Sequence, residues 1–270
     1  MSFRDLHIPG QPFIMANAWD LGSAKMLAAL GAKAIATSSA AHAFTIGQHD
    51  QGQVSGAEAI AHAGALAAAV DVPVSGDFEN GYASEGAGVA ATITAAIKAG
   101  VAGACIEDVD LPSTQPYCFD LAVSRIEAAV TAARGANTDF VLTARADGVM
   151  YGRYDLDEAI RRLRAYEEVG ADVLYVPVPG TIDDLARICA AVKSPVNVLA
   201  AGPLVHYQLS DFAQAGAARV SLGASLARVT HRAIRDCSLA LFERGDFGCL
   251  ADSIGGDEVE ALIDRAQPSR

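Results

Sequence analysis

Carboxylate side chains follow three apolar runs of the chain, at the points where each run ends. Asp77 and Glu79 end the run VPVSGDFE, Glu107 ends AGACIE, and Arg145 and Asp147 end VLTARAD. Residues two apart in an extended segment point to the same side, so Asp77 and Glu79 should face one way. Carboxylates gathered in a low-dielectric site repel one another unless a cation neutralises them. Oxygen ligands without a nearby His or Cys cluster favour Mg²⁺ or Mn²⁺ over Zn²⁺.

A single acid of this set could instead cap a helix or pair with a surface base. For Asp77, Glu79 and Glu107 together, at the ends of consecutive runs, a shared divalent cation is the favoured interpretation. Such a cation would also let an acidic site bind an anionic substrate, because it reverses the sign of the local field.

Short apolar runs rich in β-branched residues predict the elements that hold these side chains. Their continuous hydrophobicity is typical of parallel strands covered on both faces, and the alanine-rich amphipathic segments between them predict helices. About eight alternations favour a (β/α)₈ TIM barrel over a doubly wound open sheet, and the carboxyl ends of barrel strands build the active site. The runs lie at residues 13–18, 32–39, 72–79, 102–108, 139–147, 172–178, 195–201 and 218–224.

The chain has 270 residues, which suits one barrel domain over 1–270, and no Pro- or Ser-rich linker divides it. Predicted helices end at Gly31, Gly100 and Gly170, where a left-handed residue can lead into the next strand. Over about residues 225–270 the sequence predicts a helical extension. This extension is either a contact between subunits or a cover for its own barrel.

The composition excludes several classes of protein. The formal net charge of −12 disfavours nucleic acid as a partner, because binding to phosphates needs clustered Lys and Arg. Five cysteines without a CxxC pair are typical of reduced thiols in the cytoplasm. The first residues lack the build of a signal peptide, and no apolar run approaches the roughly 18 residues of a membrane span. We expect a cytoplasmic protein that binds neither membranes nor nucleic acid.

Short motifs, in the order of the predicted strands, carry a resemblance to a known family. DFENGY at 77–82 matches the family motif D-x-D-T-G-Y-G, with Glu79 in place of the second Asp. The other landmarks are Ser38 and Ser39 for a Ser-Gly pair, GQHD ending at Asp50 for G-x-x-D, IED at 106–108 for I/L-E-D, and ARAD at 144–147 for A-R-T/A-D. Over about residues 12–245 the chain resembles the isocitrate lyase/phosphoenolpyruvate mutase superfamily.

The resemblance implies a magnesium-dependent barrel enzyme and gives roles to the acids. Asp77 would contact Mg²⁺ or Mn²⁺ most directly, and Asp50, Glu79 and Glu107 would hold its water ligands. Arg145 would hold a substrate carboxylate or an enolate oxygen. Arg145, Glu107 and Asp50 are therefore the expected catalytic residues.

The resemblance also implies where a small carboxylate or 2-oxo acid substrate would bind. Ser38, Ser39 and their backbone amides would receive its carboxylate. Asn17 and Trp19 would line the pocket, although a buried Trp is more often part of a core. Gln115 could orient the substrate or a water molecule. The family resemblance further implies a homotetramer with exchanged C-terminal helices.

The loop after the fourth predicted strand, residues 109–119, departs from the family's patterns. It lacks the K-K/R-C-G-H motif of isocitrate and methylisocitrate lyases, and Cys118 lies about three residues beyond the expected place, without flanking Lys, Gly or His. It also lacks the Lys and the Asn or Thr of the mutase and of phosphonopyruvate hydrolase. Pro177 stands where the mutase has a His. A loop or packing thiol is the favoured interpretation of Cys118.

These observations predict a lyase that cleaves a C–C bond next to an enolate-forming 2-oxo or 2-hydroxy carboxylate, such as an oxaloacetate-like or methylisocitrate-like acid. The alternatives are a P–C bond enzyme and a non-catalytic barrel that binds oxo-acids. An aldolase with a Schiff-base lysine is disfavoured, because the lysines Lys25, Lys33, Lys98 and Lys193 lie in predicted helices or turns and not at strand ends.

Overall fold

The computed structural model describes residues 2–136 and 138–266, and in them eight parallel strands close into a barrel in the order β1-β10-β9-β8-β7-β4-β3-β2. The prediction of a barrel over an open sheet is confirmed, because β1 pairs with β10 through Phe13 and Arg219. Each predicted apolar run contains one strand. The strands are β1 (Phe13–Asn17), β2 (Ile35–Ala36), β3 (Val74–Asp77), β4 (Gly103–Ile106), β7 (Val141–Arg145), β8 (Val173–Tyr175), β9 (Val196–Leu199) and β10 (Arg219–Ser221).

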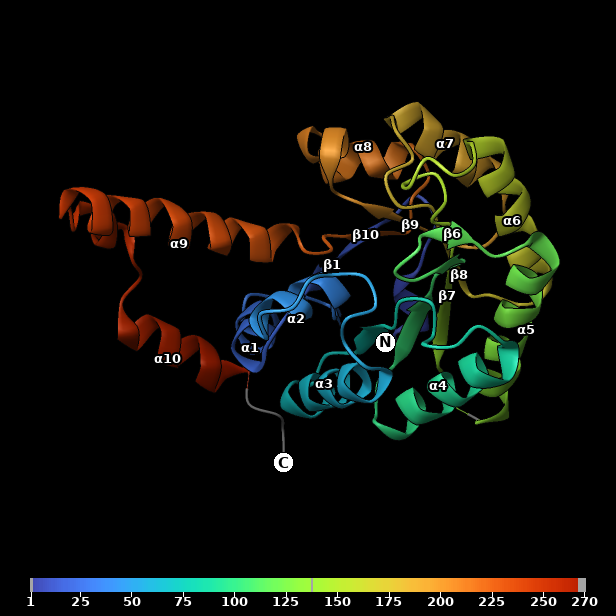
Figure 1. Cartoon of the computed structure of the whole chain (residues 1–270), viewed down its shortest axis with the longest axis horizontal. Coiled ribbons are helices and arrows are strands. Elements are labelled where there is room, and N and C mark those ends of the chain that lie inside the picture. Colours follow the sequence, from blue (N-terminus) through green and yellow to red (C-terminus); the bar gives the residue numbers. More distant parts are fainter. Residues whose placement is uncertain (1, 137, 267–270) are drawn as a thin grey trace.

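Helices surround the barrel and alternate with its strands (Figure 1). They are α1 (Leu21–Ala29), α2 (Ser39–Thr45), α3 (Gly56–Ala69), α4 (Gly86–Lys98), α5 (Phe119–Gly135), α6 (Leu156–Glu168), α7 (Ile182–Ala191) and α8 (Leu209–Gln214), with 3-10 turns η1 (Arg4–Leu6) and η2 (Gly202–His206). In the part of the chain that the structure describes, no helix is both long and apolar enough to cross a membrane.

Local sequence explains why these helices begin and end where they do. Asp20 and Ser55 cap α1 and α3 by accepting hydrogen bonds from backbone N–H groups of the first turn. Gly31, Gly100 and Gly170 have φ values of 100°, 86° and 100°, a left-handed conformation that favours glycine. The predicted glycine stops are confirmed, and they return the chain directly to the next strand.

The core has two parts, because alternate strand residues point to opposite faces. Residues such as Leu142, Ala144 and Val198 face outward and pack against the helices. At the amino-terminal end of the barrel, Phe13, Val173 and the residues packed with them fill the interior. The carboxyl-terminal half of the interior is lined by polar side chains instead.

The chain after β4 forms a hairpin, β5 (Val109–Asp110) and β6 (Gln115–Pro116), where the sequence predicted only a loop. After β10, α9 (Ser225–Arg244) extends away from the barrel (Figure 1). The chain then passes through η3 (Gly248–Asp252), and α10 (Gly256–Arg265) returns to pack against α1. The extension therefore covers little of its own barrel and leaves Ile234, Phe242 and Phe247 exposed by 64%, 85% and 68%.

Candidate active site

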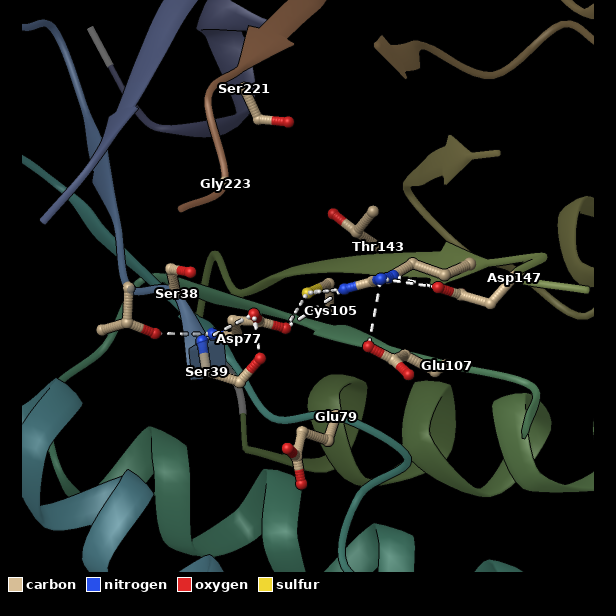
Figure 2. Close-up of polar contacts among 12 residues, drawn as sticks. Ser38, Ser39, Asp77, Glu79, Cys105, Glu107, Thr143, Asp147, Ser221 and Gly223 are labelled. Atoms are coloured by element: carbon tan, nitrogen blue, oxygen red, sulfur yellow. Dashed lines mark hydrogen bonds and ion pairs between the residues drawn. The ribbon is translucent and has the colours of Figure 1, made fainter. Parts of the chain in front are cut away.

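Asp77, the last residue of β3, lies in a set of hydrogen bonds at the carboxyl-terminal mouth of the barrel (Figure 2). Its Oδ2 accepts hydrogen bonds from the backbone N–H and the hydroxyl of Ser39, both at 2.9 Å. Its Oδ1 accepts from the Cys105 thiol at 3.2 Å and from Arg145 Nη1 at 3.2 Å. The backbone N–H of Asp77 donates to Thr37 Oγ1 at 2.8 Å, which fixes the strand end.

Arg145 ends β7 and is surrounded by three carboxylates. Its Nη2 lies 2.6 Å from Asp147 Oδ1 and 3.0 Å from Glu107 Oε1, and its Nη1 contacts Asp77. Nε donates to the second oxygen of Asp147 at 3.1 Å, so this pair is bidentate. Burial alone would lower the pKa of the guanidinium, but Asp147 and Glu107 outweigh burial and raise it. Arg145 is therefore a fixed, permanently charged donor at the mouth.

Glu107 follows β4 and is 5% exposed. One carboxylate oxygen binds Arg145, but the other, Oε2, is buried without a hydrogen-bond partner. Burial raises the pKa of Glu107, Arg145 opposes that rise, and Asp147 and Asp77 add to it. A buried carboxylate oxygen without a partner marks a place where a cation or a proton donor would be stabilised.

Glu79 does not continue the extended strand, because its φ is +47° and β3 ends at Asp77. The expectation that Asp77 and Glu79 point the same way by strand alternation is wrong. Figure 2 shows the Glu79 side chain set apart from Glu107 and Asp147. Its Oε1 accepts from the Gly52 N–H at 3.0 Å, and its Oε2 is buried without a partner. Burial raises the pKa of Glu79 to about 7, and Asp77 and Asp50 add to the rise.

Asp50 lies on the same loop as Gly52, between α2 and α3. Desolvation raises the pKa of its carboxyl group, and the negative charge of Asp77 adds to that rise. Glu79 and Asp50 therefore share the electrostatic environment of Asp77, although no direct hydrogen bond joins them to it.

The acids fit a hard divalent cation by their chemistry. Two unpartnered buried oxygens, Glu79 Oε2 and Glu107 Oε2, lie in a group of carboxylates with raised pKa values, which a cation would relieve. In residues 2–136 and 138–266, however, no three or more side chains of His, Cys, Asp or Glu are positioned so that together they could hold a metal ion. Instead, the positive charge of Arg145 neutralises Asp77 and Glu107 through ion pairs.

The two serines of the expected carboxylate site begin α2. Ser38 is buried and its hydroxyl caps the helix by accepting from the Ala41 N–H at 3.3 Å. Ser39 binds Asp77, as described above. Asn17 is also buried, and both ends of its amide are hydrogen-bonded: Nδ2 donates to Thr37 O at 2.7 Å, and Oδ1 accepts from Leu222 and Gly223 N–H, each at 2.9 Å. Asn17 thus ties β1 to β2 and β10.

Other expected site residues have only local polar contacts in the part of the chain that the structure describes. The Trp19 N–H binds Ser23 Oγ at the start of α1. Gln115 is exposed on the hairpin, where its N–H donates to Ser113 Oγ. Cys118 is exposed at the amino end of α5. The structure brings together Asp77, Glu107, Arg145 and Ser39, and within the described residues no hydrogen bond or ion pair joins Trp19, Gln115 or Cys118 to them.

Sequence reasoning missed the roles of Cys105 and Asp108. The inward position of Cys105 on β4 could have been found from strand alternation, since it is two residues before Glu107. Asp108 points the other way and accepts from Tyr154 OH at 2.7 Å, Tyr166 OH at 3.1 Å and Arg162 Nη1 at 3.0 Å. No local signal indicates these partners, which lie 46 to 58 residues further along the chain.

A cavity of about 50 Å³ extends from Asp77 and Arg145 into the barrel. Ser221 and Gly223 lie on one side of this space, and Asp77 and Cys105 lie on the other (Figure 2). It is lined by Met15, Asn17, Ala36, Thr37, Ser75, Gly76, Asp77, Cys105, Arg145, Tyr175, Asn197, Arg219, Ser221 and Gly223. The size suits a small polar ligand.

Comparison with known proteins identifies the family. Residues 3–242 match the family model described as phosphoenolpyruvate phosphomutase. The chain belongs to the isocitrate lyase/phosphoenolpyruvate mutase superfamily. The resemblance seen in the sequence is confirmed. This superfamily is made up of lyases and mutases, and its members generally depend on a divalent metal.

Three relatives illustrate the range of the superfamily. A crystal structure described as a lyase/mutase from Burkholderia cenocepacia J2315 has a TM-score of 0.92 and 39% identity, covering 97% of this chain and 94% of that one. Oxaloacetate acetylhydrolase in complex with its product oxalate has a TM-score of 0.87 and 26% identity, over 97% and 92%. The 2,3-dimethylmalate lyase of Eubacterium barkeri is 31% identical, over 68% of this chain and 65% of its own length.

Proposed function

We propose that this protein is a divalent-metal-dependent lyase that cleaves a C–C bond next to the 2-oxo or 2-hydroxy carboxylate group of a small acid. The observation that carries the proposal is that Asp77 and Arg145 lie at one end of a small cavity, while Glu107 pairs with Arg145 and keeps one buried oxygen unpartnered. Oxaloacetate acetylhydrolase, whose product is oxalate, supports C–C chemistry on such an acid.

Asp77 would contact Mg²⁺ or Mn²⁺ most directly, and Asp50, Glu79 and Glu107 would hold its water ligands. When bound, the metal supplies a Lewis acid that stabilises negative charge on the oxo oxygen of the substrate. Ser38 and Ser39 would receive the substrate carboxylate, with Asn17 and Trp19 lining the pocket and Gln115 reaching it from the hairpin.

Arg145 would bind the oxygen on which enolate charge develops. Its planar guanidinium donates several hydrogen bonds in fixed directions, and Asp147 holds it in place through a bidentate pair. A donor fixed before the reaction needs no reorganisation as charge grows. Burial raises the pKa of both Glu107 and Asp50, and these two carboxyl groups would exchange protons with the substrate.

A P–C bond enzyme is the second candidate, because the matching family model is that of phosphoenolpyruvate phosphomutase. A panel of oxaloacetate, methylisocitrate, isocitrate and phosphonopyruvate with Mg²⁺ separates the candidates. We expect pyruvate, oxalate, glyoxylate or succinate from a C–C substrate, and no product with Asp77→Ala as the background control. Release of phosphate from phosphonopyruvate, or its isomerisation to phosphoenolpyruvate, would favour the second candidate. Saturable binding without any product would identify a non-catalytic oxo-acid-binding protein.

We also propose that the protein is a cytoplasmic homotetramer in which the helical extension packs on a second copy. Ile234 and Phe242 on α9, and Phe247 beyond it, expose apolar surface that a partner would bury. Light scattering coupled to size-exclusion chromatography measures the mass directly. The variant Phe242→Asp should shift the mass toward smaller species, and an unchanged monomer in both proteins would refute the assembly.

A further inference from the structure

The barrel interior beneath Asp77 is unusual because it is not filled by its own side chains. TIM-barrel interiors are normally packed with bulky branched residues. Here Ala36, Ser75, Ser221 and Gly223 occupy positions around the cavity, and their small size leaves the space of about 50 Å³. Since one water needs about 10–15 Å³ of such space, the cavity can hold a carboxylate group or several waters.

A buried arginine, Arg219, lines this cavity. It is 2% exposed, and its partners are all neutral. Nε donates to Asn197 Oδ1 at 2.8 Å, Nη2 donates to Thr143 Oγ1 at 3.1 Å, and Nη1 lies 3.1 Å from His7 Nε2. Throughout the described residues, Arg219 forms no ion pair with a carboxylate, whereas Arg145 contacts three.

His7 does not neutralise this charge. Its Nδ1 lies 2.9 Å from the carbonyl oxygen of Phe3, so Nδ1 carries the hydrogen and Nε2 accepts from Arg219. Burial, and then the charge of Arg219, lower the pKa of His7 to about 3, which keeps the ring neutral. Burial lowers the pKa of Arg219 to about 10, so the guanidinium is still charged at neutral pH. A buried charge without a counter-ion is costly, and an anion in the cavity would relieve that cost.

We propose that Arg219 is a second anion-binding residue, which binds the carboxylate of the substrate that lies farthest from the reacting bond. The inference rests on the proposed function in placing the reacting end of the substrate at Asp77 and Arg145. The remote carboxylate then extends into the cavity, where two guanidinium N–H groups of Arg219 have no partner among the three contacts above. Arg219 thereby selects short dicarboxylates over monocarboxylates of the same length.

Binding of succinate and of butyrate, measured by calorimetry with Mg²⁺ and again with EDTA, tests this role without requiring turnover. The wild-type protein should bind succinate about 10- to 100-fold more tightly than butyrate, the range typical of a charge-assisted hydrogen-bonded contact. In Arg219→Met the preference should fall to within about threefold, and Arg219→Lys should keep part of it. Arg134→Met, which removes one positive charge far from the cavity, should keep the full preference.

Thermal unfolding separates this role from a structural one. If Arg219 serves binding, Arg219→Met without ligand should have an unchanged or higher Tm, because an apolar side chain replaces a buried unpaired charge. Should that variant fail to fold, Ser75→Val fills the cavity and leaves the charge in place, and succinate binding should weaken at least tenfold. A full succinate preference in either folded variant would overturn the proposal. Absence of turnover with every substrate, beside an intact preference for succinate, would instead refute the proposed function alone.

Discussion

Glu107 and Asp108 are adjacent acids at the end of the same strand, yet the structure places them in opposite situations. Asp108 faces the helices and accepts hydrogen bonds from two tyrosines, an arginine and the Asp147 N–H. Glu107 faces the barrel mouth and keeps one buried oxygen unpartnered. A carboxylate whose acceptors are all used holds the fold, whereas one that is buried and incompletely paired is available for a ligand.

The largest expected effect is at the mouth, where Asp77→Ala should lower kcat by about 10³-fold or more, because charge stabilisation at the reacting oxygen is lost. Circular dichroism should remain that of the wild type, since no core volume is removed. Asp183→Ala, an exposed acid on α7, is the matched control and should be fully active. Unchanged turnover in Asp77→Ala would show that the acids of the barrel mouth serve catalysis no more than Asp108, on the other side of the strand, does.

The next largest effect should appear in stability at the other side of the strand. Asp108→Ala breaks the buried ion pair with Arg162, which keeps only its contact with the partly exposed Glu158, and it leaves two tyrosine hydroxyls without their acceptor; the free energy of unfolding should fall by about 3 kcal/mol. Urea denaturation measures the change. A stability within about 0.5 kcal/mol of the wild type, the range of ordinary surface substitutions, would show that Asp108 does not hold the fold.

Glu107→Gln should have the opposite effect on stability to Asp108→Ala. Replacing a buried carboxylate that repels Asp147 and Asp77 by a neutral amide should raise the stability of the metal-free protein by about 1 kcal/mol, while turnover is lost. Urea denaturation in EDTA measures this change. The free energy of unfolding should rise in Glu107→Gln and fall in Asp108→Ala if the two acids differ as described. A destabilised Glu107→Gln would place Glu107 with the structural acids.

The smallest effect concerns His7, beneath Arg219. Its folded pKa of about 3 lies below the usual value near 6.5, so the unfolded chain binds a proton that the folded protein does not. The stability from the neutral ring is complete above pH 6.5 and is lost as pH falls toward 3. Between pH 7 and 6, His7→Gln should therefore lose about 0.7 kcal/mol less stability than the wild type. Identical pH profiles would show that folding does not lower the pKa of His7.

Much of this molecule could be predicted from local sequence. The eight apolar runs, the glycine stops at 31, 100 and 170, and the acids at the ends of β3 and β4 each depend on neighbours within a few residues. Helix periodicity, left-handed caps and buried strands leave local patterns, because they are determined by short-range sterics and by which faces are buried. The barrel fold and the acids at the ends of its strands follow from these patterns.

Other features were decided only when the barrel closed. The left-handed conformation of Glu79 ends the strand alternation, and no residue of the run VPVSGDFE predicts it. Arg219 lies in an apolar run typical of a strand. Its neutral partners are His7, which follows η1, and residues of strands elsewhere in the barrel, up to 212 residues away. Whether a buried charge is paired depends on which side chains the tertiary fold brings within a few ångströms, a contact that local sequence does not encode.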